Sequence, residues 1–313
     1  MTGRIRHYTV YGESLRSTIV LPELLERSNG DARWTFETAA RLEPMSNPSE
    51  LGSDLLYADV HARLHEHAAG HRIIVDDTGS FDLSADRRLV RCEERPGAWP
   101  DFVRAHLMGR VLATALYLDG LLPLHASAVE TRDGVIAFLA PKGFGKSTLA
   151  LALVTAGARL GTDDTLPIDP LKVPLAWPGV HSLRVHEDAL DALDADRPEL
   201  ATREGKRVVT SMPGDRLQRE RLPLAAIYLL DPVGPEVVAT TREEMPAMLS
   251  AIGVVAHVKI GRMLGPAAAA PMLERAAAIV REVPVFRLHA PRDLARLPET
   301  AAMILGWHGM PAA

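Results

Sequence analysis

Residues 140–148, APKGFGKST, combine the residue types that binding of a nucleoside triphosphate requires. Gly143 and Gly145 lack side chains, so backbone N–H groups can point inward at phosphate oxygens. Lys146 supplies a cation for the β- and γ-phosphates, and Ser147 supplies a hydroxyl for Mg²⁺. We take the nucleotide to be ATP. The residues expected to contact it are Lys142, Gly143, Phe144, Gly145, Lys146, Ser147 and Thr148.

The loop departs from the pattern G-x-x-x-x-G-K-[ST] at its first position, where Ala140 stands in place of glycine. A Cβ atom restricts positive φ, so alanine is tolerated at this position if the residue keeps a strand-like backbone. The apolar segment VIAFLA precedes the loop, and a helix is predicted over residues 146–156. Strand, loop and helix therefore follow in the order that phosphate binding needs, with the helix N-terminus facing the anion. A glycine-rich turn with a chance Lys-Ser is the alternative.

Two carboxylate groups compete for the metal side of such a site. Asp163 and Asp164 end the predicted strand ARLGTDD, which follows the loop helix and returns towards the loop. Adjacent carboxylates repel each other when partly desolvated, and Mg²⁺ would relieve that repulsion. Asp231 ends the apolar strand LAAIYLLD and is the second candidate. An ordinary exposed turn is the alternative for both.

His125 lies in the segment PLHASAV, upstream of the loop. A single histidine on an apolar strand is more often a packed core residue than a functional one. If this strand pairs towards the loop, however, the imidazole reaches the aspartates, where it can stabilise a carboxylate or transfer a proton.

Two domains and a helix between them are expected to carry these residues. Residues 1–97 are rich in short alternating segments such as HYTVYG, RSTIVLPEL and RWTFETA, which predict a small β-rich domain. Within it, residues 57–68 are expected to form a helix, with the histidines of HARLHEHAAGH on its polar face rather than in a metal site. Residues 98–120 predict a connecting helix, and residues 121–313 an α/β domain. Further helices are expected near residues 243–255, 271–281 and 294–305.

Composition limits the classes of partner. The 313 residues carry a net charge of −5 with both signs interspersed, which argues against a nucleic-acid partner. Cys92 is the one cysteine, so neither an intramolecular disulfide nor a thiolate metal cluster can form. We see no apolar segment typical of a signal peptide or a membrane span. The expected protein is cytoplasmic and without a membrane partner.

Taken together, His125-x-Ser, PKGFGKST and GTDD resemble the catalytic domain of the HPr kinase/phosphorylase family. The likeness covers residues 120–235 and extends to LAAIYLLDP. It is greater to HPr-kinase-related proteins of peptide-modification clusters, including kinases that phosphorylate a serine of lasso-peptide precursors. The resemblance implies a P-loop kinase domain like the HPr kinase C-terminal domain. Because hexamers occur in the family, it also implies that a homo-oligomer can form.

The resemblance also implies roles for particular residues. Asp163 would act as general base on the acceptor hydroxyl, assisted by His125, while Lys146 contacts the phosphates. Ser147, Asp164 and Glu187 would hold Mg²⁺. The basic segment GKRVV, with Lys206 and Arg207, lies where related proteins carry a basic loop that neutralises phosphate charge; a solvated turn is its alternative.

Three functions are compatible with these residues. The first is an ATP- and Mg²⁺-dependent kinase for a Ser or Thr hydroxyl of a peptide or protein, such as a lasso-type precursor. The second is a P-loop ATPase or nucleotide-dependent switch that transfers no phosphate to an acceptor. The third is a non-catalytic binding protein, which the alanine at position 140 favours. Only the kinase requires a carboxylate base for transfer but not for nucleotide binding.

Overall fold

The computed structural model describes residues 5–195, 198, 202, 205–210, 212, 216–230 and 237–310. Two compact units make up the chain. The first contains residues 1–120 together with 259–272, and the second contains residues 121–258 and 273–313. The division into a domain of residues 1–97, a connecting helix of residues 98–120 and a domain of residues 121–313 stays a prediction.

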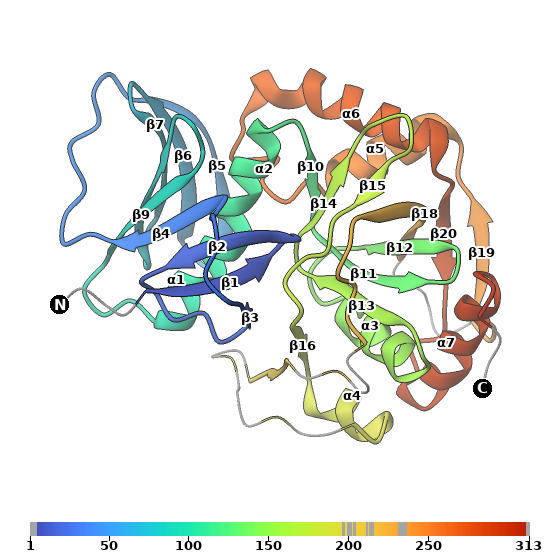
Figure 1. Ribbon diagram of the computed structural model, residues 1–313. Coiled ribbons are helices and arrows are strands. Elements are labelled where there is room, and N and C mark those ends of the chain that lie inside the picture. Colours follow the sequence, from blue (N-terminus) through green and yellow to red (C-terminus); the bar gives the residue numbers. More distant parts are fainter. Residues whose placement is uncertain are drawn as a thin grey trace. The chain divides into compact units, whose positions relative to one another are not determined.

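The first unit is built on a sheet of nine strands (Figure 1). Their order is β3-β1-β2-β4-β9-β8-β7-β6-β5, with the consecutive strands β5 to β9 forming an antiparallel meander. The strands are β1 (Arg6–Val10), β2 (Glu13–Ser17), β3 (Leu25–Glu26), β4 (Trp34–Thr38), β5 (Ser49–Tyr57), β6 (Val60–His67), β7 (Gly70–Val75), β8 (Gly79–Ser84) and β9 (Leu89–Glu94).

The helix predicted over residues 57–68 is wrong, because this segment forms the end of β5, a turn and β6. Along β6 burial alternates with a period of two, and only Ala62 and Leu64 are fully buried. That period belongs to a strand with one face on the core. The strand predicted through RSTIVLPEL is wrong beyond Ser17, where β2 ends. The histidine segment is therefore strand, and no group of metal-binding side chains occurs within the described residues.

Helical structure runs from residue 100 to residue 118, as predicted, but with a change of pitch. Pro100–His106 is α1, Leu107–Val111 is a π-helical turn, and Leu112–Leu118 is α2. The Tyr11 hydroxyl donates to the Met108 carbonyl oxygen at 2.7 Å, inside this turn. The widened turn is thereby tied to the sheet core, where the Tyr11 ring meets the Trp34 ring edge-on.

The second unit contains a mixed sheet in the order β10-β14-β15-β18-β12-β11-β13, with β20 beside β18 and β19 beside β20. Strands β12, β18 and β20 are parallel. The strands are β10 (Leu122–Leu124), β11 (Ala126–Thr131), β12 (Gly134–Leu139), β13 (Arg159–Asp163), β14 (Leu166–Asp169), β15 (Leu175–Ala176), β18 (Leu222–Leu230), β19 (Thr241–Glu244) and β20 (Val285–His289). A separate pair consists of β16 (Leu183–Val185) and β17 (Arg207–Val209).

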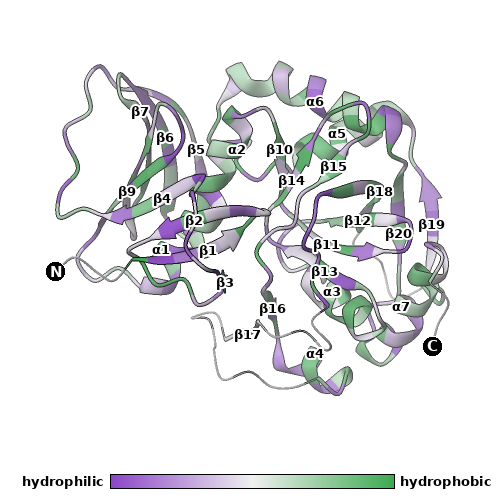
Figure 2. Ribbon diagram, viewed as in Figure 1, coloured by the Kyte–Doolittle hydropathy of each residue, from purple (hydrophilic) through white to green (hydrophobic). Residues whose placement is uncertain are grey.

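Helices cover this sheet (Figure 1). They are α3 (Lys146–Thr155), α4 (Glu187–Ala192), α5 (Ala247–Ala256), the part of α6 (Ala269–Glu282) from residue 273 onward and α7 (Leu297–Gly306), with a short 3₁₀ turn at Leu294–Arg296. The 3₁₀ turn at Pro266–Ala268 and the first residues of α6 belong to the first unit. The helix predicted from residue 243 begins only at Ala247. Residues 241–244 instead form β19, an exposed edge strand that Figure 2 colours hydrophilic.

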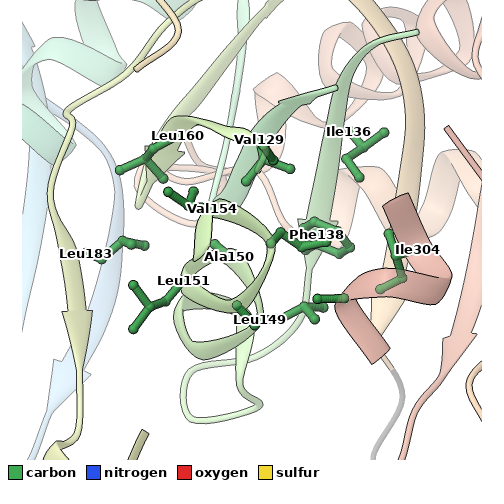
Figure 3. Close-up of a cluster of buried hydrophobic side chains, with 14 of the residues drawn as sticks. Val129, Ile136, Phe138, Leu149, Ala150, Leu151, Val154, Leu160, Leu183 and Ile304 are labelled. Carbon is green, nitrogen blue, oxygen red and sulfur yellow. The ribbon is translucent and has the colours of Figure 1, made fainter. Parts of the chain in front are cut away.

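The core around α3 fixes the orientation of the helix (Figure 3). Its side chains Leu149 and Ala150 belong to one buried cluster that includes Phe138 of β12 and Ile304 of α7. Apolar residues surround most of α3, which is typical of a helix buried on several sides. Because α3 cannot rotate in this core, its first turn presents the residues after Gly145 at a fixed place.

No helix within the described ranges is long and apolar enough to cross a membrane.

Burial makes the Cys92 thiol a test of the first sheet. Burial is the largest cause that raises the pKa of Cys92, to about 12, so almost no thiolate forms near neutral pH. We expect a thiol reagent at pH 8 to label the native protein at least ~100-fold more slowly than the unfolded chain. With a reagent that releases a coloured thiolate when it reacts, the rise in absorbance gives the labelling rate of the native protein and of the chain unfolded in guanidinium. Rapid labelling of the native protein would contradict the burial of Cys92 in this sheet.

Candidate active site

The phosphate-binding loop follows β12 and leads directly into α3. Gly143 and Gly145 have φ values of 89° and 85°. A Cβ atom at either position would meet nothing within 4 Å, so the backbone conformation, and not space, requires glycine there. Ala140 is buried and is absent from the described residues with positive φ. Ala140 therefore does not adopt the left-handed conformation that favours glycine, although it lies just beyond the end of β12.

Lys146 is the buried cation of the loop. Its side chain is 7% exposed, and its ammonium donates to the carbonyl oxygens of Ala140 at 2.7 Å and Pro141 at 3.2 Å. These bonds hold the ammonium within the curve of the loop. Bound β- and γ-phosphates would accept further hydrogen bonds from it there. Thr148 lies in the first turn of α3, and Lys142 is exposed on the loop.

Pairing of β10 and β11 with β14 and β13 brings the aspartates to this loop. β11 pairs with β13 so that Ser127 lies opposite Asp163, and β10 pairs with β14 so that Leu124 lies opposite Leu166. At these positions the two pairs share one antiparallel register, which shifts further along β11, between Ala128 and Val129. His125 lies at the break between β10 and β11, not inside a strand, and Asp164 lies at the break between β13 and β14. The two breaks therefore coincide in space.

Asp163 is surrounded by hydrogen-bond donors. Its Oδ1 accepts from the Ser127 hydroxyl at 2.5 Å, and its Oδ2 accepts from the Arg184 backbone N–H at 3.0 Å. The Ser147 hydroxyl is a further partner. Desolvation nevertheless dominates and raises the pKa of Asp163; the donors oppose this rise, and the neighbouring charge of Asp164 adds to it.

Asp164 faces the other way, towards His125. The His125 Nδ1 lies 3.4 Å from Asp164 Oδ1 and 3.0 Å from the Asp164 carbonyl oxygen. The two side chains are each about one-third exposed, at 33% and 32%. Asp163 is the last residue of β13 and its carboxylate meets Ser147, whereas Asp164 lies in the break after the strand and its carboxylate meets the imidazole. The resemblance paired His125 with Asp163, whereas the contacts pair it with Asp164.

Glu187 does not join this group by any contact in the described residues. It begins α4, and its Oε1 accepts from Arg207 of β17, with the Nη2–Oε1 distance at 2.6 Å. Arg207, the arginine of the predicted basic loop, is therefore paired with Glu187. Asp231, the other carboxylate candidate, lies outside the described residues.

The oxygen donors around Ser147 fit Mg²⁺. Magnesium prefers hard oxygen ligands and is usually held by one or two carboxylates together with substrate phosphates and water. Ser147 and the partly buried Asp163 are already in contact, and the donors around the Asp163 carboxylate offset only part of its desolvation. Ser147 and Asp163 would hold the ion, whereas Asp164, the next residue in the chain, faces His125.

His257 is a site residue that the sequence reasoning missed. It ends α5, its backbone carbonyl accepts from the His125 N–H at 2.7 Å, and its Nδ1 contacts the Gly253 carbonyl oxygen at 2.8 Å. Burial lowers the pKa of His257, and the charges of Lys146 and His125 lower it further. No sequence motif marks this position, because the contact depends on how α5 packs on the sheet.

Comparison with known proteins gives a distant likeness. The structure of the Hpr(Ser) kinase/phosphatase from Coxiella burnetii matches 59% of this chain and 96% of its own, with 13% sequence identity and a TM-score of 0.32. No protein-family model and no curated protein matches the sequence. At this distance the likeness does not place the chain in a family. The narrower resemblance to lasso-peptide-precursor kinases stays a prediction.

The backbone of the loop predicts how glycine and alanine can be exchanged there. Ala140→Gly should leave the Kd for ATP within about twofold, because Ala140 needs no positive φ. Gly145→Ala should weaken binding about tenfold, since a left-handed backbone costs a non-glycine residue about 1–2 kcal/mol. Isothermal titration of both variants checks this. A large gain in affinity from Ala140→Gly would show that the alanine impairs the loop.

The raised pKa of Asp163 predicts that its charge destabilises the fold. The native state holds this proton more tightly than the unfolded chain, so stability is lost as pH rises through the ordinary aspartate range and above. Without divalent cations, Asp163→Asn should therefore raise the free energy of unfolding at pH 7.

Denaturant unfolding in EDTA at pH 7 and pH 5 measures the difference, with Asp59→Asn in the exposed turn between β5 and β6 as the control variant. The gain from Asp163→Asn should shrink at the lower pH, where the wild-type carboxyl is closer to its protonated form. A loss of stability at pH 7 would mean that the donors outweigh the desolvation.

Proposed function

We propose that this protein is an ATP- and Mg²⁺-dependent kinase that phosphorylates a Ser or Thr hydroxyl of a peptide or protein. The observation that carries the proposal is the convergence of Lys146, the Ser147–Asp163 contact and the His125–Asp164 pair around one loop. Phosphoryl transfer needs positioned charge more than covalent chemistry, and these residues supply both positive and negative groups.

The loop and α3 would bind the nucleotide. Backbone N–H groups around Gly143 and Gly145 and the N-terminus of α3 attract phosphate oxygens, and Lys146 adds a full charge. Bound Mg²⁺ would neutralise charge that develops between the β- and γ-phosphates. Ser147 and Asp163 support its binding because their oxygens already lie together beside the loop.

Asp164 is the favoured general base. The acceptor hydroxyl gives its proton to the carboxylate as its oxygen forms a bond to the γ-phosphorus, and the bond to the β-phosphate oxygen breaks to release ADP. Asp164 is about one-third exposed, with its Oδ1 beside His125 and its Oδ2 accepting from the neighbouring Thr165 hydroxyl at 3.1 Å. The Asp163 oxygens accept from the Ser127 hydroxyl and from the Arg184 backbone N–H, which ties them to other strands. His125, beside Asp164, orients this carboxylate and stabilises its charge.

The test is incubation of candidate peptides with ATP and Mg²⁺, followed by mass spectrometry for a gain of one phosphate. Lys146→Ala should lower transfer at least ~100-fold, through loss of charge stabilisation. Asp164→Asn should lower transfer by about 100-fold or more and leave the Kd for ATP nearly unchanged, because a base acts only on the acceptor. Asp169→Asn is the control and should transfer normally.

Two further variants separate the alternatives. If Asp163 is the base, Asp163→Asn will retain Mg²⁺-dependent ATP binding, and Asp164→Asn will lose it. Glu187→Gln should transfer normally if Glu187 only pairs with Arg207, and should lose activity if it holds the metal. ADP release with no peptide phosphorylated by any variant would favour the ATPase, and binding without ADP release would favour the non-catalytic protein.

A further inference from the structure

An arginine from a distant part of the chain lies on the phosphate-binding loop. The Arg292 guanidinium carbon is 5.1 Å from the centroid of the Phe144 ring, within the range of a cation–π contact. Phe144 stands between the two glycines of the loop and is partly buried, while Arg292 is exposed. The sequence alone suggests only a strand end and a helix start at Arg292 and Asp293.

The topology puts Arg292 at the edge of the sheet where ligands bind. The loop follows the carboxyl end of β12, and Arg292 follows the carboxyl end of β20. β18 is parallel to both of these strands and lies between them. Carboxyl ends of parallel strands meet at one edge, and open α/β sheets bind ligands there. The stacked pair therefore joins two loops of the same edge.

The charge of Arg292 is not used by another group in the described part of the chain. No described carboxylate pairs with it, and its neighbour Asp293 accepts instead from the Ala295 N–H at 3.0 Å. Arg296, one turn further on, differs, because its guanidinium is bound by both carboxylate oxygens of Glu299. The guanidinium carbon lies over the Phe144 ring while the Arg292 side chain is exposed, so N–H donors of the guanidinium stay accessible.

We propose that Arg292 is a phosphate-binding residue, held ready by Phe144, whose guanidinium edge donates to the phosphate chain of the nucleotide. The inference rests on the nucleotide binding in the proposed function. A guanidinium fits phosphate oxygens through two parallel hydrogen bonds, which an ammonium cannot make. It would add a second fixed cation to that of Lys146, which is partly occupied by two carbonyl oxygens.

The experiment measures Kd by isothermal titration for ATP and for inorganic tripolyphosphate, which has the phosphates but no base or ribose. Arg292→Ala should weaken binding of both ligands about tenfold, the effect of a charge-assisted hydrogen bond. Arg292→Lys should recover only part of this, and Phe144→Leu should cost less than Arg292→Ala. Arg296→Ala is the matched control and should bind both ligands as the wild type does.

Three outcomes would overturn the proposal. The first is unchanged Kd values in Arg292→Ala, and the second is a loss confined to ATP, which would assign the stacked pair to the base. The third is no binding of either ligand by the wild type, which also removes the proposed function. If Arg292→Ala weakens both ligands but the wild type phosphorylates no acceptor, the kinase proposal fails and the role of Arg292 stands. Thermal unfolding midpoints show that the variants are folded.

Discussion

The antiparallel register shared by β10–β14 and β11–β13 is the constraint on which the site depends. It places Ser127 opposite Asp163 and makes both strands break at the same point. At that point one aspartate meets the P-loop serine and the next meets His125. A slip of one residue would exchange the two sides of the strand and send each carboxylate to the wrong neighbour.

Electrostatic cost accompanies this arrangement. A carboxylate that is short of water beside a second carboxylate is held in place only because backbone and hydroxyl donors surround it. The charge of Lys146 is compensated in the same way, because its buried ammonium donates to two carbonyl oxygens. Such preorganised charges suit a site that stabilises a phosphate, because the groups need little rearrangement when the anion arrives.

The central strands of the second unit, and the helices packed on both of their faces, fix the positions of the site residues. β18 shows this, because Tyr228 packs into the core with α3 and α7 whereas the next side chain, Leu229, lies against Gly253 of α5. Helices on both faces therefore hold the central parallel strands. At their carboxyl edge, α3 presents Lys146, the end of α5 presents His257, and the segment after β20 presents Arg292. Loops on a fixed sheet edge can bring together residues far apart in sequence.

The sequence by itself determined the loop, the helix after it and the strands that flank it. These follow from local patterns: glycines that permit positive φ, an apolar strand, and a lysine and a serine at a set spacing. It also singled out Asp163, Asp164 and His125. Only the tertiary structure decided which aspartate meets which partner, paired Glu187 with Arg207, and turned the predicted helix at residues 57–68 into strands. Strand pairing and side-chain contacts join distant residues, and local propensity carries no information about such partners.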